Sequence, residues 1–284
     1  MTEAPPEPPP LTRAVNRALA RASHGTSAPV TLPVPEMHHQ PLVTMAVIAL
    51  AGLLTITAFA GPTMVAVALG FAAGVIAWGW AGLLGLPSPR GTSVVLALGS
   101  AAAIGTALAT TQDPFLAWMP AALAGSMIIA FLHQLARRDG RPRLVESVAS
   151  TITAVAIVVS GASLVGLSRT EHGAWAVAIA SAAMAVSAVT DLAGGSRRLL
   201  PWLLPLAMLA GGLAAILVGY LLGAVGWGAA ALLGVLSAGV SHAVRRVLGT
   251  LPAISGPRSQ LVSASASVLT SGVVVYVVGR LLLA

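Results

Sequence analysis

Nine apolar segments, each close to twenty residues long, constrain the fold of this chain more than any other feature. A helix needs about 20 apolar residues to cross the roughly 30 Å hydrocarbon core of a bilayer. The segments are continuous and rich in Ala, Leu and Val, without the alternation that a transmembrane β-strand shows. The predicted spans are residues 42–60, 63–86, 92–111, 115–136, 144–167, 173–193, 199–223, 227–248 and 261–283.

Composition leads to the same fold class. Hydrophobic residues make up 57% of the chain and charged residues 8%, whereas soluble domains average about 45–50% and about 25%. A soluble fold of 284 residues needs far more surface charge than this chain carries. We therefore predict an all-α, polytopic transmembrane helical bundle over residues 42–284. The chain has no cysteine, which excludes disulfides, thiolate metal sites and cysteine nucleophiles.

Residues 1–41 differ from the rest and form a predicted cytoplasmic tail. The tail opens with a proline run, which cannot be helical and favours a disordered or extended chain. No signal peptide is predicted, because the first apolar run begins only at Leu42. We predict that the tail is disordered, basic and proline-rich. The alternative is a short helix on an anionic leaflet, because Arg13, Arg17 and Arg21 recur at four-residue spacing.

The densest charge lies at residues 133–150, near the middle of the apolar region. Arg137, Arg138, Arg141 and Arg143 fall within seven residues there. Gly140 and Pro142 follow the first arginine pair, and Pro142 disfavours helix at the residue before it. We interpret the stretch as a loop that orients the chain.

The other connections between spans have the same bias. Even-numbered connections hold ten arginines, whereas the odd-numbered ones hold only Arg169. Such an excess of positive charge marks the cytoplasmic side of membrane proteins. We therefore expect a multi-pass protein of the plasma (inner) membrane, with the N-terminus in the cytoplasm and the C-terminus outside.

Few ionisable residues lie within or beside the spans, and these are the candidate functional groups. His133, Glu146, Asp191 and His242 all map to the predicted cytoplasmic ends of their helices. One interpretation is interfacial anchoring and local ion pairing. The other gathers them with neighbouring arginines into one vestibule for a phosphate or carboxylate group. The candidate anion- or headgroup-binding residues are His133, Arg137, Arg138, Arg141, Arg143, Glu146, Asp191, Arg197, Arg198, His242, Arg245 and Arg246.

Enzyme motifs are missing from the sequence. We find no HExxH, no P-loop and no GxSxG elbow, and we predict no catalytic residue, metal site or cofactor. The leading hypothesis is a small permease-like carrier or the membrane subunit of a larger complex. The alternative is a lipid-processing membrane enzyme with an arginine-rich cytoplasmic site. Expected partners are the bilayer, anionic headgroups and a second membrane protein. Nucleic acid is not expected, because the arginines are scattered among apolar segments.

The sequence contains two further, weaker patterns. Gly70/Gly74 and Gly219/Gly223 have the GxxxG spacing that lets membrane helices pack closely. Residues 133–150 also resemble residues 242–267, since in both a His and an Arg pair precede a Pro-Arg loop and a Ser-rich segment. A parallel internal repeat would produce this similarity.

Overall fold

The computed structural model describes residues 40–196, 198–223 and 225–283, all within one compact unit. Across these residues there is no strand, and nine helical segments are long and apolar enough to cross a membrane. The predicted all-α bundle is thereby confirmed, and the segments fit a multi-pass integral membrane protein. The tail prediction falls on residues 1–39, outside the described part of the chain, as does Arg197.

The spans follow one another through short connections. Eight of them are single helices: α2 (Pro41–Ala60), α3 (Pro62–Leu83), α4 (Pro89–Ala109), α5 (Met119–Ala136), α6 (Leu144–Leu167), α7 (Gly173–Thr190), α8 (Leu203–Leu222) and α9 (Trp227–Leu248). The ninth consists of α10 (Pro257–Thr270) and α11 (Gly272–Leu282). Short 3₁₀ helices η1 (Asp191–Gly195), η2 (Leu200–Trp202) and η3 (Pro252–Ser255) lie in the connections.

Prolines mark where helices begin. Four α-helices start on a proline, a position where its missing N–H has no helical partner to lose. Pro120 and Pro205 lie in the first turns of α5 and α8, and Pro201 lies in η2. These three prolines therefore do not kink the middle of a span.

Three predicted spans begin four residues away from the start of their α-helix, and the one predicted from residue 199 does so because η2 precedes α8 (Leu203–Leu222). The fourth span begins at Met119 instead of residue 115, because the apolar residues before it form turns, with Ala117 N–H donating to Pro114 O. The ninth span begins at Pro257 instead of residue 261. Its polar first turn hid the start, since the apolar pattern begins only at Leu261.

The ninth span is also broken at Ser271, which the sequence did not predict. The hydroxyl of Ser160, on α6, donates to Thr270 O at 2.8 Å and accepts from Val273 N–H at 2.9 Å. The Ser160 hydroxyl therefore forms hydrogen bonds with backbone groups on both sides of the break. The counterpart in the predicted repeat, α6, is unbroken.

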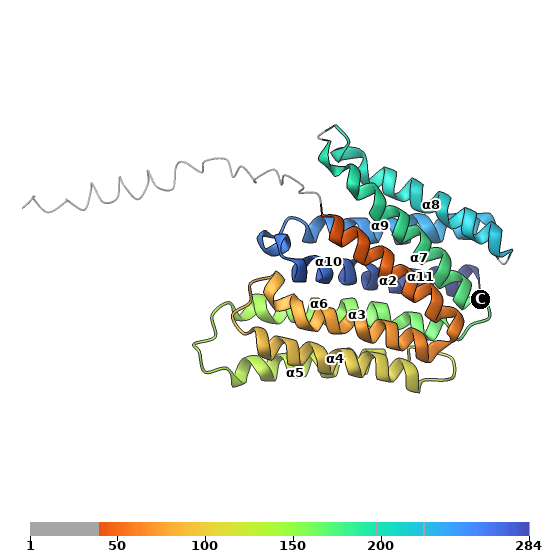
Figure 1. The fold of residues 1–284 in the computed structure, drawn as a ribbon. Helices are drawn as coiled ribbons and strands as arrows, with labels where there is room; N and C mark the ends of the chain where they lie inside the picture. The colour runs from red at the N-terminus through yellow and green to blue at the C-terminus, as the bar shows by residue number, and fades with distance from the viewer. Residues whose placement is uncertain (1–39, 197, 224, 284) are drawn as a thin grey trace, which may run out of the picture. The chain divides into compact units, whose positions relative to one another are not determined.

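The ninth span lies at the centre of the bundle. α10 packs against α2, α3, α6 and α9, and α11 packs against α6, α7 and α9. Figure 1 shows α3–α6 on one side of α2 and α10–α11, and α7–α9 on the other. The most deeply buried span is the ninth, and the most exposed is α5. Polar serines of α10 therefore lie in the interior of the bundle.

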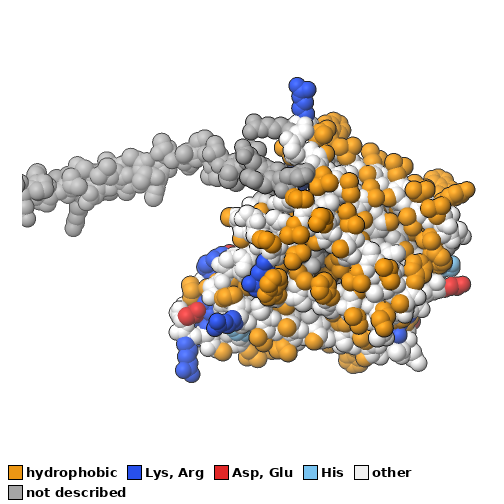
Figure 2. Space-filling model, in the orientation of Figure 1, with side chains coloured by type: hydrophobic (Ala, Val, Ile, Leu, Met, Phe, Trp, Pro, Cys, Tyr) orange, Lys and Arg blue, Asp and Glu red, His pale blue; other side chains and the backbone are white. Residues whose placement is uncertain are grey.

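One end of the bundle carries most of the arginines. It is the end at which α2, α4, α6, α8 and α10 begin and α3, α5, α7 and α9 finish, toward the left of Figure 1. We call it the arginine-rich end. Figure 2 shows hydrophobic side chains across the middle of one face, with charged side chains toward its margins. This distribution suits a protein whose middle is surrounded by lipid.

Most glycines of the predicted GxxxG pairs do not pack closely against another helix. A Cβ added at Gly70 or Gly74 would meet nothing within 4 Å, so neither glycine packs against another helix. Gly219 does pack, facing Ala230 on α9, whereas Gly223 ends α8 with a φ of 64°. The closest approaches lie elsewhere, and a Cβ at Gly272 would come within 2.2 Å of Ser160 O.

Candidate functional site

The structure describes eleven of the twelve predicted site residues, and ten of these lie in two separate groups. Around the connection from α5 to α6 lie His133, Arg137, Arg138, Arg141, Arg143 and Glu146; around the ends of α7 and α9 lie Asp191, His242, Arg245 and Arg246. Within the described chain, no hydrogen bond or ion pair joins the two groups. Arg198 is exposed in the connection after η1, and Arg197 lies outside the described residues.

Arg137 anchors the loop after α5. Its guanidinium is almost fully buried, donating to Gln134 Oε1 at 2.7 Å and to both carboxylate oxygens of Asp139, at 2.6 and 3.1 Å. These hydrogen bonds hold the pKa of the exposed Asp139 carboxyl below its usual value. Arg138 remains exposed beside them. These contacts fix the shape of the loop, and the charge of Arg137 is paired within it by Asp139.

Arg143 ties two loops of the arginine-rich end together. It pairs with Glu146 through two hydrogen bonds and donates to Gly85 O, in the connection after α3, at 2.7 Å. The bonds to Glu146 raise the pKa of the Arg143 guanidinium. Glu146 also lies in the first turn of α6, where the helix dipole favours an anion. Arg141 caps the end of α5, donating to Leu135 O at 2.9 Å.

His133 packs between helices. Its Nε2 lies 3.2 Å from the hydroxyl of Ser88. The ring rests against Gly91, where an added Cβ would come within 1.9 Å of it. His133, Arg137, Arg141 and Arg143 therefore make structural contacts within one loop region, whereas Arg138 is exposed.

The ends of α7 and α9 hold a buried charge cluster: Ser187, Asp191, Ser241, His242 and Arg245. Arg245 Nε donates to Asp191 Oδ2 at 2.5 Å, and Nδ1 of His242 lies 2.7 Å from Asp191 Oδ1. The side chains of Arg245 and His242 are 4% and 2% exposed, and that of Asp191 is 20% exposed. Asp191 is thus the shared acceptor of two buried basic groups.

Two serines complete the coordination of Arg245. Nη1 donates to the hydroxyl of Ser241 at 2.6 Å, and Nη2 donates to that of Ser187 at 3.0 Å. Neither serine was among the predicted site residues, because serine carries no charge. A signal was present, since Ser187 precedes Asp191 by four residues and Ser241 precedes Arg245 by four, which places each pair on one helix face.

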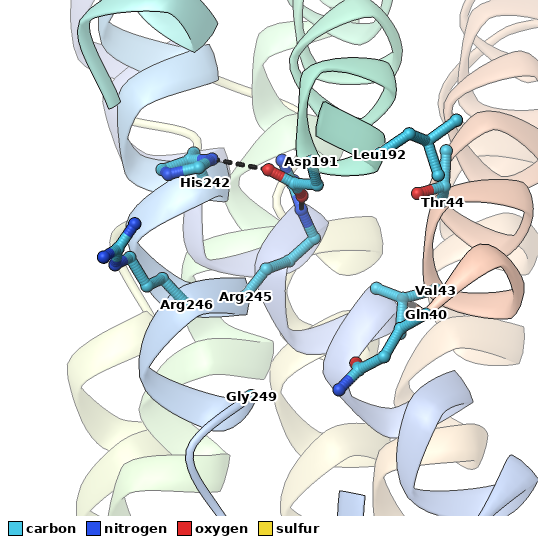
Figure 3. A pocket seen from close by; sticks show the side chains of 9 residues that line it. All are labelled: Gln40, Val43, Thr44, Asp191, Leu192, His242, Arg245, Arg246 and Gly249. Atoms are coloured by element: carbon cyan, nitrogen blue, oxygen red, sulfur yellow. Dashed lines mark hydrogen bonds and ion pairs between the residues drawn. The ribbon is translucent and has the colours of Figure 1, made fainter. Parts of the chain in front are cut away.

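A pocket opens beside the charge cluster, between α2 and the ends of α7 and α9 (Figure 3). Its volume of about 50 Å³ suits a small ion or a few water molecules. Thr44 fixes the wall on the α2 side by donating to Ala188 O at 3.2 Å. The pocket is lined by Gln40, Val43, Thr44, Asp191, Leu192, His242, Arg245, Arg246 and Gly249.

The charges on the lining favour an anion. Asp191 and Arg245 offset each other, and Arg246 adds a further positive charge. Arg246 is exposed and donates from Nη1 to Leu200 O at 3.1 Å, which leaves other donors of its guanidinium available. A guanidinium is well suited to carboxylate, sulfate or phosphate oxygens.

One buried polar atom of the cluster has no partner. An ionised carboxylate only accepts hydrogen bonds, so Nδ1 of His242 carries a proton toward Asp191. The other ring nitrogen, Nε2, is buried and has no hydrogen-bond partner among the described atoms. A buried polar atom left unsatisfied costs about 1–3 kcal/mol. Among the described residues, the cluster therefore has one buried ring nitrogen without a hydrogen bond.

In residues 40–196, 198–223 and 225–283, no three His, Cys, Asp or Glu side chains come together in a way that could hold a metal ion.

Comparison with known proteins identifies no family, because no family model, no curated protein and no solved structure matches the chain.

Proposed function

We propose that the protein is a small permease-like carrier of the plasma membrane and that the pocket between α2, α7 and α9 is its solute site. The observation that carries the proposal is the buried cluster of Asp191, His242 and Arg245 beside that pocket. Ionisable groups inside a membrane bundle are expensive to bury, and they usually mark the path of a substrate or an ion.

The broken ninth span supports the same proposal. Discontinuous helices in carriers place free backbone groups near the middle of the membrane. Here the break lies in the most enclosed span, α10–α11, and both halves contact helices from either side of the bundle. The hydroxyl of Ser160 bonds to backbone groups on both sides of this break, so a polar contact lies inside the most enclosed span.

The ten-to-one arginine bias supports an orientation for this carrier. With the arginine-rich end in the cytoplasm, the pocket opens toward the cytoplasmic side. Opposite it, Arg280 on α11 pairs with Asp113, in the connection before α5, at 2.5 Å. This ion pair joins the α4–α5 connection to the end of the central span.

The test of the carrier is uptake into proteoliposomes. Purified protein is reconstituted, and the entry of labelled sulfate, acetate and succinate is compared with protein-free liposomes. We expect at least one anion to enter faster with the wild-type protein and more slowly with Arg246→Gln. Arg90→Gln is the matched control, because Arg90 is exposed at the same end and does not line the pocket. Equal rates with and without protein for every anion would contradict the proposal.

A membrane subunit of a larger complex is the second candidate, and the surface of α8 favours it. Leu209, Leu213, Leu217 and Leu221 are exposed at four-residue spacing along this helix, and this apolar stripe offers a surface to lipid or to a helix of a partner. Native gel electrophoresis of solubilised membranes distinguishes the candidates. A subunit migrates at a mass well above that of the purified protein, whereas a carrier acting alone does not. Stabilisation by a nucleotide or a divalent metal would instead favour the lipid-processing enzyme.

A further inference from the structure

Arg258, in the first turn of α10, is held against α3. Its Cζ lies 4.4 Å from the centroid of the Trp78 ring, a distance at which a guanidinium is attracted to the face of an indole. The aliphatic stem passes over Gly79, where an added Cβ would come within 3.2 Å of Arg258 Cγ. The missing side chain of Gly79 leaves the room that the stem occupies. The contacts with α3 therefore hold the guanidinium in place without a ligand.

The positive charge of Arg258 has no partner in the part of the chain that the structure describes. There, no carboxylate pairs with it and no oxygen accepts a hydrogen bond from its guanidinium. By contrast, Arg245 at the same end of the bundle pairs with Asp191. Stacking on a ring uses the face of a guanidinium and leaves N–H donors at its edge. Arg258 can therefore still bind the oxygens of an anion.

The surface beside Arg258 is apolar and belongs to α3. Trp78 is 53% exposed, and Phe71 and Val67 continue the same exposed face toward the other end of the helix. Trp78 lies five residues before the end of α3 at Leu83, which is roughly 8 Å along the helix axis. Trp and Arg side chains favour this depth, where the hydrocarbon meets the headgroups. In a membrane that covers this span, the guanidinium faces headgroups and the apolar face meets acyl chains.

We propose that Arg258 and Trp78 form a binding site for one anionic phospholipid, with the lipid phosphate at the guanidinium and the acyl chains along the exposed face of α3. An unpaired cation beside lipid is costly, and an anionic headgroup supplies the missing charge. A zwitterionic headgroup brings its own cation, so it compensates Arg258 less. The lipid site lies apart from the pocket, which neither residue lines, and it does not depend on transport.

Native mass spectrometry of the detergent-purified full chain tests the lipid site. The protein is mixed with graded amounts of phosphatidylglycerol, phosphatidylcholine or soluble glycerol phosphate, and the fraction carrying one bound molecule is measured. We expect the wild type to bind one phosphatidylglycerol at concentrations at which the other two bind little. Arg258→Gln should weaken this binding roughly tenfold or more, since it removes a charged donor.

Arg90→Gln is the matched control and should leave phosphatidylglycerol binding unchanged. Arg90 is exposed at the same end of the bundle, and among the described residues it stacks on no aromatic ring. A lipid that responds only to the total charge of this end would lose affinity equally in Arg90→Gln and Arg258→Gln, and that result would contradict a site at Arg258.

Trp78 positions the guanidinium, so its aromatic ring should matter more than its apolar bulk. Trp78→Leu keeps an apolar side chain but removes the ring, and we expect roughly two- to fivefold weaker binding of phosphatidylglycerol. Trp78→Phe keeps a ring and should retain most of the wild-type affinity. Arg258 and Trp78 are both exposed, so the midpoint of thermal unfolding without added lipid should stay unchanged in these variants.

The inference is overturned if Arg258→Gln binds phosphatidylglycerol as tightly as the wild type does. Equal binding of phosphatidylcholine would show that the net charge of the headgroup plays no part, and equal binding of glycerol phosphate would identify a free phosphate as the ligand. A lipid-free dimer would assign the exposed face of α3 to a second copy of the chain, because Gly70 and Gly74 are open on that face. Each of these three results also rejects the lipid site.

Discussion

The hydroxyl of Ser160 accepts a hydrogen bond from the backbone N–H of Val273 at 2.9 Å, although 113 residues separate the two in the chain. The same hydroxyl donates to Thr270 O, so one side chain of α6 bonds to both halves of the ninth span. The break between α10 and α11 is therefore a tertiary feature that needs a neighbouring helix to complete it.

Replacing Ser160 with alanine should leave the Val273 N–H and Thr270 O without their partner. Unsatisfied backbone groups cost about 1–3 kcal/mol each when buried. Because Ser160 is half-buried, we expect the free energy of unfolding to fall by an amount near the lower value. Thermal unfolding in detergent measures it. Ser168→Ala is the control, because that hydroxyl bonds only to Val165 O, three residues earlier. Equal midpoints for the two variants would contradict the assigned role.

Gly272→Ala should be more damaging than Gly74→Ala. A Cβ at Gly272 would lie 2.2 Å from Ser160 O, a backbone atom that cannot rotate away, whereas nothing lies within 4 Å of one at Gly74. Overpacking costs about 1–3 kcal/mol, while alanine in an open helical position is neutral or gains up to about 1 kcal/mol. The midpoints of thermal unfolding should therefore move in opposite directions or by clearly different amounts. A similar loss for both variants would show that α6 and α11 are less closely packed.

Asp191→Asn should destabilise the protein by about 3 kcal/mol, because it leaves the buried Arg245 without its counter-ion. Asp139→Asn breaks an ion pair whose carboxylate is exposed, and it should change the unfolding midpoint little. If the two variants unfold at the same temperature, the α7–α9 cluster is more hydrated than its burial indicates.

The pKa of Asp139 should rise toward its ordinary value in Arg137→Gln, since the hydrogen bonds from Arg137 are the main cause of its lowering. A lowered carboxyl pKa means that the ion pair contributes stability above the unfolded-state value, and that this contribution is lost as pH falls through the folded-state value. Carbon NMR of labelled aspartate, titrated from pH 6 downward in both proteins, measures the shift. An unchanged midpoint would contradict the pairing.

Topology reporters fused after Gly140 and after Leu283 should report opposite sides of the membrane. We expect the first on the cytoplasmic side because of the ten-to-one arginine bias, and the second outside if all nine segments cross the membrane. Signals from the same side would contradict the odd number of spans.

The fold was predictable from the sequence because span length and apolar continuity are local properties. The boundaries at Leu144, Leu167 and Trp227 agree with the prediction, since polar or glycine-containing turns flank those helices. The break at Ser271 was not predictable, because its cause is Ser160 on another helix.

The candidate site was predictable only in part. Asp191, His242 and Arg245 could be selected because charge is rare in the spans. The sequence does not show which charged residues pair with one another. Arg143 and Glu146 are close in sequence and pair locally, whereas Asp191 pairs with residues 51 and 54 positions away. That pairing depends on how α7 packs against α9, a property of the three-dimensional arrangement.

Among the described spans, the most enclosed one comes last in the chain, and this sets the order in which the bundle can be assembled during synthesis. Until α10 leaves the ribosome, the faces of α2, α3, α6 and α9 that it covers must be occupied by lipid or by the insertion machinery. The earlier spans can enter the bilayer one by one, and pairs such as α8 and α9 can pack before α10 is made. The four faces that α10 covers cannot reach their final packing until residues 257–270 are inserted.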